Sequence, residues 1–284
     1  MTNTSLAVNP HAPLPYSLIA LIRSLLKNWQ LILQMTKRDV IGKYKGSVMG
    51  LAWSFLNPIV MLIVYTFVFS EIFKSRWSGI NATESKSQFA VILFVGIIVL
   101  SLISEVLNRS AVLMVSNVNY IKKVIFPLEI LSIVSVLTAC FHSLVSILVL
   151  IFGLLILNGE LPWTILYLPL VLIPFLFLVL GLSWILASLG VYLKDVGQAM
   201  GIITTMMTFL SPVFYPLSAV PESVKPLILL NPPTFVIEQI RSILLWGKHP
   251  SWFGLVIYYV VAISIAWIGF IWFQKTRKGF ADVL

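Results

Sequence analysis

Residues 36–58 read "TKRDVIGKYKGSVMGLAWSFLNP" and change character within a few positions. The stretch holds four basic side chains within nine residues and then becomes apolar, with no further charge before Glu71. The four are Lys37, Arg38, Lys43 and Lys45. Dense positive charge directly before a long apolar run is typical of the cytoplasmic side of a first membrane span, because short cytoplasmic segments hold an excess of Lys and Arg. The stretch therefore predicts an integral membrane protein.

The rest of the chain is apolar enough for further spans. Of its 284 residues, 59% are hydrophobic and only 10% are charged, which is too little polar surface for a water-soluble domain of this length. A helix needs about 20 apolar residues to cross the hydrocarbon core. We therefore expect an all-α membrane protein that forms one domain over residues 1–284, with six spans within residues 51–273. The spans are predicted at 51–73, 89–107, 128–157, 163–193, 197–217 and 252–273.

The fifth predicted span is the least regular. Gly197, Gly201, Pro212 and Pro216 all weaken a continuous helix there. We expect this segment to be tilted or to stop short of the far surface.

The distribution of charge predicts the orientation. With six spans and a cytoplasmic N-terminus, thirteen of the 19 Lys and Arg residues fall on the cytoplasmic side. The polar tail 1–16 and the tail 274–284 are then both cytoplasmic, and no secretory signal peptide is predicted. The net charge of +9 is mostly a topology signal, so nucleic acid is not expected as a partner.

The segment before the first span predicts an interface helix at residues 17–36. Arg23, Lys27, Gln30 and Gln34 recur at helical spacing and share one narrow face, while apolar residues cover the rest. This pattern favours a helix lying in the cytoplasmic membrane interface. The alternative is an ordinary helix of a small soluble cap.

Two loops are too apolar to be simple connections. The inner loop at 108–130 predicts a short amphipathic helix, which either docks on a cytoplasmic partner or lies on lipid. The outer loop has six prolines between Pro212 and Pro233, which predicts short re-entrant helices instead of one long helix. Within it, Asn231 followed by Pro232 is typical of a helix start, and Glu238 with Arg241 forms an i,i+3 pair.

Motifs for catalysis and for nucleotide binding are missing. Gly42-Lys43 and Gly247-Lys248 both lack the remaining residues of a phosphate-binding loop, so any nucleotide energy must come from another chain. The acidic residues are scattered, and His11, His142 and His249 lie far apart in the sequence. We therefore predict no enzyme, no metal site and no cofactor bound by this chain. His142, in the middle of a span, keeps an ion-coupled carrier as the weaker alternative.

Three stretches, in this order, carry a family resemblance. They are "RDVIGKYKGSVMGLAWSFLNPIVMLIVYTFVFSEIF" at 38–73, "YIKKVIFPLEIL" at 120–131 and "SPVFYPLSAVPESVKPLILLNPPTFVIEQIRSILL" at 211–245. Together they resemble the membrane subunits of type 2 ABC exporters, in particular permeases that export O-antigen, capsule or teichoic acid polymers across the bacterial inner membrane.

The resemblance implies a half-transporter. Two copies of the chain would join two separate ABC ATPase subunits, which bind ATP and Mg²⁺, and would export a lipid-linked glycan, most simply an O-antigen-like one. Capsule or teichoic acid polymers are the alternatives within the family. From other classes, an ion-coupled carrier or flippase without ATP and a scaffold subunit of a membrane synthase stay open.

The resemblance also implies roles for two sets of residues. The segment that couples to the ATPase would contain Asn117, Asn119, Tyr120, Lys122, Lys123 and Phe126. The outer gate would contain Pro212, Pro216, Asn231, Pro232, Glu238 and Arg241.

Two further sets are hypotheses about the substrate. Lys43 and Lys45, with Arg23 and Lys27, would attract the pyrophosphate of the lipid carrier, at about 1 kcal/mol for each basic side chain near an anionic surface. The alternative is that these cations only fix topology. Aromatic residues would stack on sugar rings along the conduit, or would simply face lipid. They are Trp53, Tyr65, Phe67, Phe69, Phe209, Phe214 and Tyr215.

Overall fold

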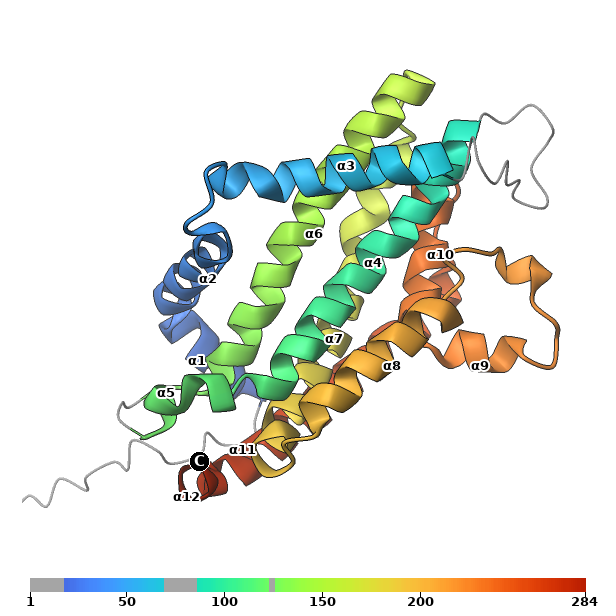
Figure 1. Ribbon diagram of the computed structural model, residues 1–284. Helices are drawn as coiled ribbons and strands as arrows, with labels where there is room; N and C mark the ends of the chain where they lie inside the picture. Colours follow the sequence, from blue (N-terminus) through green and yellow to red (C-terminus); the bar gives the residue numbers. More distant parts are fainter. Residues whose placement is uncertain (1–17, 69–85, 123–125) are drawn as a thin grey trace, which may run out of the picture.

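The computed structural model describes residues 18–68, 86–122 and 126–284 (Figure 1). The regular secondary structure of these residues is all helical, with no strand among them. The α-helices of five residues or more are α1 (Leu18–Lys27), α2 (Trp29–Tyr44), α3 (Trp53–Phe67), α4 (Lys86–Val112), α5 (Val118–Lys122), α6 (Glu129–Asn158), α7 (Leu168–Tyr192), α8 (Val196–Leu210), α9 (Lys225–Leu230), α10 (Pro232–Leu244) and α11 (Trp252–Thr276). A last short helix, α12 (Phe280–Val283), ends the chain.

Five helical segments of the described residues are long and apolar enough to cross a membrane. They are Gly50–Phe67, Phe89–Val112, Glu129–Ile156, Trp163–Tyr192 and Trp252–Val283. The fifth predicted span, 197–217, corresponds to α8, which ends at Leu210 before Pro212. Its 15 residues extend about 22 Å, less than the roughly 30 Å of hydrocarbon. This segment is therefore a short helix, as the glycines and prolines predict.

Helix α4 is the centre of the bundle. It packs against α3, α6, α7, α8 and α10, and 78% of its span is buried. Helix α3 lies across α4 and α6 at the periphery (Figure 1), with only 6% of its span buried. The apolar side chains of α4 therefore form the core, whereas those of α3 face outward.

Small residues allow a close helix contact between α7 and α11. A Cβ atom added at Gly181 would lie 2.5 Å from the backbone oxygen of Ile265, and one added at Gly269 would overlap the backbone of Gly181. The two backbones therefore touch, as expected where van der Waals packing associates helices in lipid.

The predicted interface helix forms two helices instead of one. The chain breaks at Asn28, whose side-chain amide donates to the Ser24 carbonyl at 2.8 Å, and α2 then continues through the basic block to Tyr44. The turn into α3 begins only after Tyr44 and includes Gly46 at φ 91°. Ile32, Met35 and Val40 are buried, so α2 packs on the bundle with one face.

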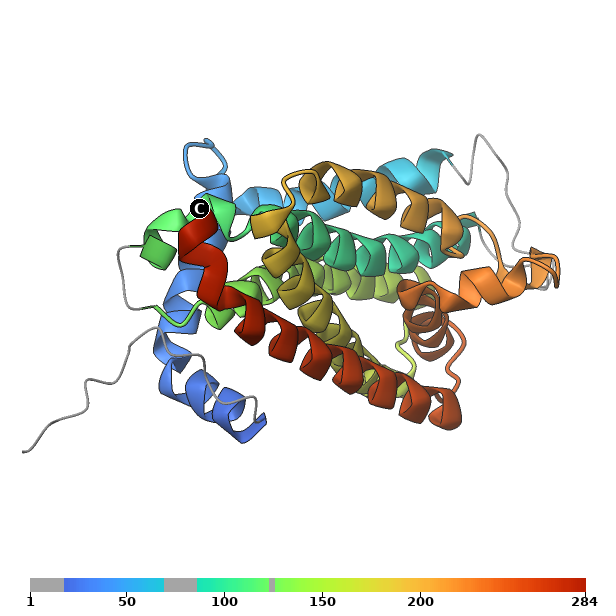
Figure 2. The same cartoon turned by 90° about the horizontal axis from the view of Figure 1, so that it is seen from below.

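The bundle has two distinct ends. The ends of α1, α5 and α12 lie together at one end, which we call the α5 end (Figures 1 and 2). Helices α9 and α10 lie at the opposite end, the α10 end. The two loops that the sequence marks as unusually apolar therefore lie at opposite ends of the molecule.

Candidate functional site

The predicted coupling segment is a short helix held from one side. In α5 and the residues after it, Ile121 and Phe126 are buried in an apolar cluster with α1, α2, α6, α7 and α11, and Tyr120 packs its ring on Phe126 with centroids 4.6 Å apart. Asn119 and Lys122 are exposed. The helix therefore turns a polar face away from the bundle. The Asn117 side chain forms a local hydrogen bond, donating to the carbonyl of Leu113 just after α4. Lys123 lies outside the described residues.

A buried ion pair lies behind this segment. Glu129, at the start of α6, accepts a 3.1 Å bond from Arg277, and both side chains are almost fully buried. Ser24 of α1 donates to the same carboxylate at 3.1 Å, and the Trp184 indole of α7 donates to the Glu129 carbonyl. A buried pair is tolerated when further hydrogen bonds satisfy its remaining atoms. This network joins α1, α6, α7 and the C-terminal segment. No local sequence pattern predicts it.

Six polar side chains link α2 to α4 and α6, and we call them the polar ladder. In the first rung, Asp39 forms an ion pair with Arg109 and accepts a 3.1 Å hydrogen bond from Thr138. In the second, Lys43 pairs with Glu105 at 3.0 Å, and Glu105 also lies 3.0 Å from Nδ1 of His142.

The polar ladder changes the expected environment of two residues. His142 of α6 is not isolated from other ionisable groups, because Glu105 of α4 and Lys43 of α2 lie within contact distance of its ring. Lys43, predicted as an entrance cation, is half exposed and already paired. The other entrance cations, Arg23, Lys27 and Lys45, are exposed.

Arg241 is the most densely bonded side chain at the α10 end. It is fully buried, and its Nη1 atom donates to the Pro212 carbonyl at 2.6 Å and to Glu238 at 2.9 Å. Its Nε and Nη2 atoms donate to the Ile92 carbonyl of α4, and Nη2 also donates to the Val213 carbonyl. Burial lowers the pKa of Arg241 to about 10 while Glu238 opposes the shift, so the guanidinium stays charged at neutral pH.

The remaining residues of the predicted outer gate lie at the start of α10 and in the segment after α8. Asn231 stands at the N-cap of α10, as predicted, and Pro232 begins the helix. The Asn231 side chain, however, does not cap α10: it donates to the Ser211 hydroxyl at 2.8 Å and so ties α10 to the end of α8. Pro232 is held through its carbonyl, which accepts a 3.0 Å hydrogen bond from Tyr258 of α11. Pro212 is buried and Pro216 is half-buried.

The predicted conduit aromatics divide by exposure. Trp53 and Phe67 of α3, Phe209 of α8 and Phe214 after it are exposed. Tyr65 is partly buried against the core, and Tyr215 is half-buried with its hydroxyl donating to the Phe209 carbonyl. Phe69 lies outside the described residues. Helices α3 and α8, which carry Trp53, Phe67 and Phe209, both pack on α4 and lie on the same side of the bundle (Figure 2).

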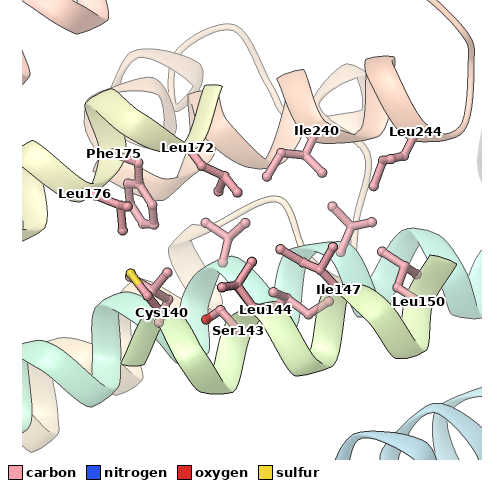
Figure 3. Close-up of a pocket in the computed structure, with 14 residues that line it drawn as sticks. Cys140, Ser143, Leu144, Ile147, Leu150, Leu172, Phe175, Leu176, Ile240 and Leu244 are labelled. Atoms are coloured by element: carbon pink, nitrogen blue, oxygen red, sulfur yellow. The ribbon is translucent and has the colours of Figure 1, made fainter. Parts of the chain in front are cut away.

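An apolar cavity of about 110 Å³ lies between α4, α6, α7 and α10 (Figure 3). Aliphatic and aromatic side chains line it, with Cys140 and Ser143 at its edge. It offers no charge and few hydrogen-bonding groups, so it suits neither a glycan nor a metal ion. Elsewhere in the described part of the chain, no three His, Cys, Asp or Glu side chains are grouped as metal ligands.

The fold and these two ends define the class of protein. An apolar helical bundle with a short polar-faced helix at one end and short proline-started helices at the other is the arrangement that the family resemblance implies. A family model described as an ABC-2 type transporter matches residues 30–245 of the chain. The chain therefore belongs to this family and is a permease, a multi-pass protein of the bacterial inner membrane.

Relatives that are similar in sequence to this chain are named as permeases of O-antigen export. The O-antigen export system permease protein RfbA of Myxococcus xanthus is 27% identical over 269 residues, which cover 93% of this chain and 99% of the relative. Two proteins of the same name from Klebsiella pneumoniae are each 23% identical over 258 residues, covering 90% of this chain and 95% of the relative. The similarity thus extends over nearly the full length of both partners.

Proposed function

We propose that the chain is the permease subunit of an ATP-driven exporter that moves a lipid-linked, O-antigen-like polysaccharide across the inner membrane. The observation that carries this proposal is the end-to-end similarity to permeases named for O-antigen export. Two copies of the chain would work with two copies of a separate ATPase. The α5 end, with both described chain ends near it, would face the cytoplasm.

The coupling role of α5 rests on its two faces. Because Ile121 and Phe126 are buried in the bundle, a push on the helix is transferred to the spans beneath it. Because Asn119 and Lys122 are exposed, they offer hydrogen-bond donors to a partner. ATP and Mg²⁺ would bind the partner, and closure of the ATPase pair would move α5.

The exposed face of α3 and α8 supports a second copy of the chain. In the single chain, Trp53 and Phe67 of α3 and Phe209 of α8 are exposed. A contiguous exposed apolar surface of a membrane protein meets lipid or another protein. In the proposed homodimer the face would border the conduit, where exposed rings would slide along sugar faces.

The exposed cations near the α5 end would recruit the lipid pyrophosphate. Arg23, Lys27 and Lys45 carry the available charge, whereas Lys43 shares its charge with Glu105. Replacing Arg23, Lys27 and Lys45 by Gln should lower export while leaving membrane insertion and assembly intact. Unchanged export would assign these cations to topology alone.

The experiment that tests the proposed function is genetic complementation. The chain, expressed with the ATPase encoded beside it, should restore surface polysaccharide to a bacterium that lacks its O-antigen permease and ATPase. Restoration of only a capsule or a teichoic acid would assign the alternative polymer. Export by the chain without any ATPase would favour the ion-coupled carrier, for which the paired span residues Glu105 and His142 are candidates.

A further inference from the structure

The polar ladder has a regular spacing that simple surface pairing does not require. In each of its three helices the two members stand four residues apart: Asp39 and Lys43, Glu105 and Arg109, Thr138 and His142. Four residues make about one turn and about 6 Å of rise, so each pair lies on one face of its helix. All three faces meet at the same place.

The order of charges matches the directions of the helices. Along α2 the acid precedes the base, and along α4 the acid Glu105 precedes the base Arg109. Asp39 nevertheless pairs with Arg109, and Lys43 with Glu105, because the paired residues follow each other in opposite order along the two helices. Opposite charges therefore meet in both rungs.

This pattern allows only one axial position of α2. If α2 slid by one turn in one direction, Lys43 would stand opposite Arg109. If it slid by one turn in the other direction, Asp39 would stand opposite Glu105. Both shifts bring like charges together in a partly buried site, where such repulsion is weakly screened. Sliding would also remove the hydrogen bonds of Thr138 and His142.

Further contacts join α2 to the parts of the chain that would move. Arg38, one residue before Asp39, donates to the Tyr120 hydroxyl of α5 at 3.2 Å. Helix α5 lies in the connection from α4 to α6, the two helices that hold the other sides of the polar ladder. A displacement of α5 therefore acts on α4 and α6, and through them on α2.

We infer that the polar ladder holds α2 in a single axial register on α4 and α6, so that these three helices move as one body. Asp39, Lys43, Glu105, Arg109, Thr138 and His142 are then positioning residues for export. The inference about motion rests on the proposed function. It also assigns α2 to the moving body of the transporter, in place of a passive anchor lying in the lipid interface.

The test measures the register directly by the distance between two spin labels. In a Cys140→Ser chain, labels at Gln34→Cys on α2 and Leu144→Cys on α6 occupy exposed positions. The purified permease in lipid nanodiscs should give a single narrow distance distribution. Lys43→Glu or Glu105→Lys alone should broaden it or shift it by up to about 6 Å, one helical turn. The fourfold reversal Asp39→Lys, Lys43→Asp, Glu105→Lys and Arg109→Glu restores alternating charges on both helices and opposite charges in both rungs, so it should restore the narrow distribution.

Three further variants keep the test decisive. Lys37→Glu is the matched control, because Lys37 is exposed on α2 and pairs with no acidic group in the described chain, and it should leave the distribution unchanged. If the reversals do not fold, the neutral variants Asp39→Asn and Arg109→Gln should each broaden the distribution. Single reversals without effect, or a folded fourfold reversal that stays broad, would overturn the inference.

The motion is tested separately from the register. With the ATPase present, trapping ATP should leave the α2–α6 distance unchanged, while distances from α2 to α11 are free to change. A changed α2–α6 distance would contradict movement as one body. The register measurement needs no ATPase, so a failure of the proposed function would show as absent ATPase binding with the reversal and rescue pattern intact.

Discussion

Arg241 is the residue on which the α10 end depends most. Each of its five N–H donors has an acceptor, and these acceptors belong to α4, to the segment after α8 and to α10 itself. No apolar side chain can replace these bonds, because the carbonyls of Ile92, Pro212 and Val213 would lose their donors inside an apolar bundle. The side chain therefore fixes how the proposed gate sits on the central helix.

Replacing Arg241 should strongly destabilise the purified chain. Arg241→Met leaves Glu238 and three carbonyls without their partner, and we expect a loss of about 3–5 kcal/mol, the range for breaking a buried pair. Thermal unfolding in detergent measures it. Arg241→Lys should recover only part of the stability, because Lys cannot place donors in a planar fork. An apparent Tm of Arg241→Met equal to that of the unaltered chain would contradict this stabilising role of Arg241.

Some of this residue's surroundings could be predicted from sequence. The i,i+3 spacing predicted the Glu238–Arg241 ion pair, and the Asn231-Pro232 sequence predicted the start of α10; both predictions are confirmed. The burial of Arg241 and its bond to Ile92, 149 positions away, could not be predicted. A local pattern contains no information on which distant backbone oxygen will face a side chain.

At the scale of elements, the short helix α5 is the part most exposed to a partner. Its polar residues Asn119 and Lys122 face outward, while its apolar residues are buried. A contact made by the outward residues can be removed without loosening the fold, because surface substitutions away from buried features usually change stability by less than about 0.5 kcal/mol.

A double change on α5 should therefore separate binding from folding. We expect Asn119→Ala with Lys122→Glu to weaken binding of the ATPase by about tenfold, equal to about 1.4 kcal/mol, with an unchanged apparent Tm. Pull-down with a tagged ATPase measures it. Lys248→Glu, an exposed lysine at the α10 end, is the control and should leave ATPase binding intact. Equal binding by both variants would remove α5 from the coupling surface.

The elements also show where sequence patterns stop being informative. Helical periodicity predicted an amphipathic segment at 17–36, and its polar residues Arg23, Lys27 and Gln34 are indeed exposed. The break at Asn28 was not predicted, because it needs only one local side-chain bond to Ser24. The polar ladder left a signal that could have been found: the basic block includes an acid, Asp39, four residues before Lys43, and α4 repeats the same pair.

At the scale of the whole molecule, the unequal burial of the spans needs a partner or lipid to explain it. The α4 span is 78% buried and the α3 span 6%. Helix α8 is too short to cross alone and exposes Ile202, Met206 and Phe209. A single sequence gives the periodicity of these helices but not whether lipid or a second copy covers them.

Cysteine cross-linking should show whether a second copy covers this face. In a Cys140→Ser chain, Phe209→Cys should form a disulfide-linked dimer in native membranes under mild oxidation. Val256→Cys, which is also exposed but on α11, should give far less dimer. Equal cross-linking at both positions would contradict a dimer face formed by α3 and α8.

We propose that this permease moves a lipid-linked glycan only when a separate ATPase drives it. The most direct measurement is glycan translocation in proteoliposomes that contain the chain alone, the chain with its ATPase, or the chain with an ATPase that binds ATP but cannot hydrolyse it. We predict ATP-dependent translocation only with the active ATPase. Translocation by the chain alone, or with the inactive ATPase, would contradict transport driven by ATP hydrolysis in the partner.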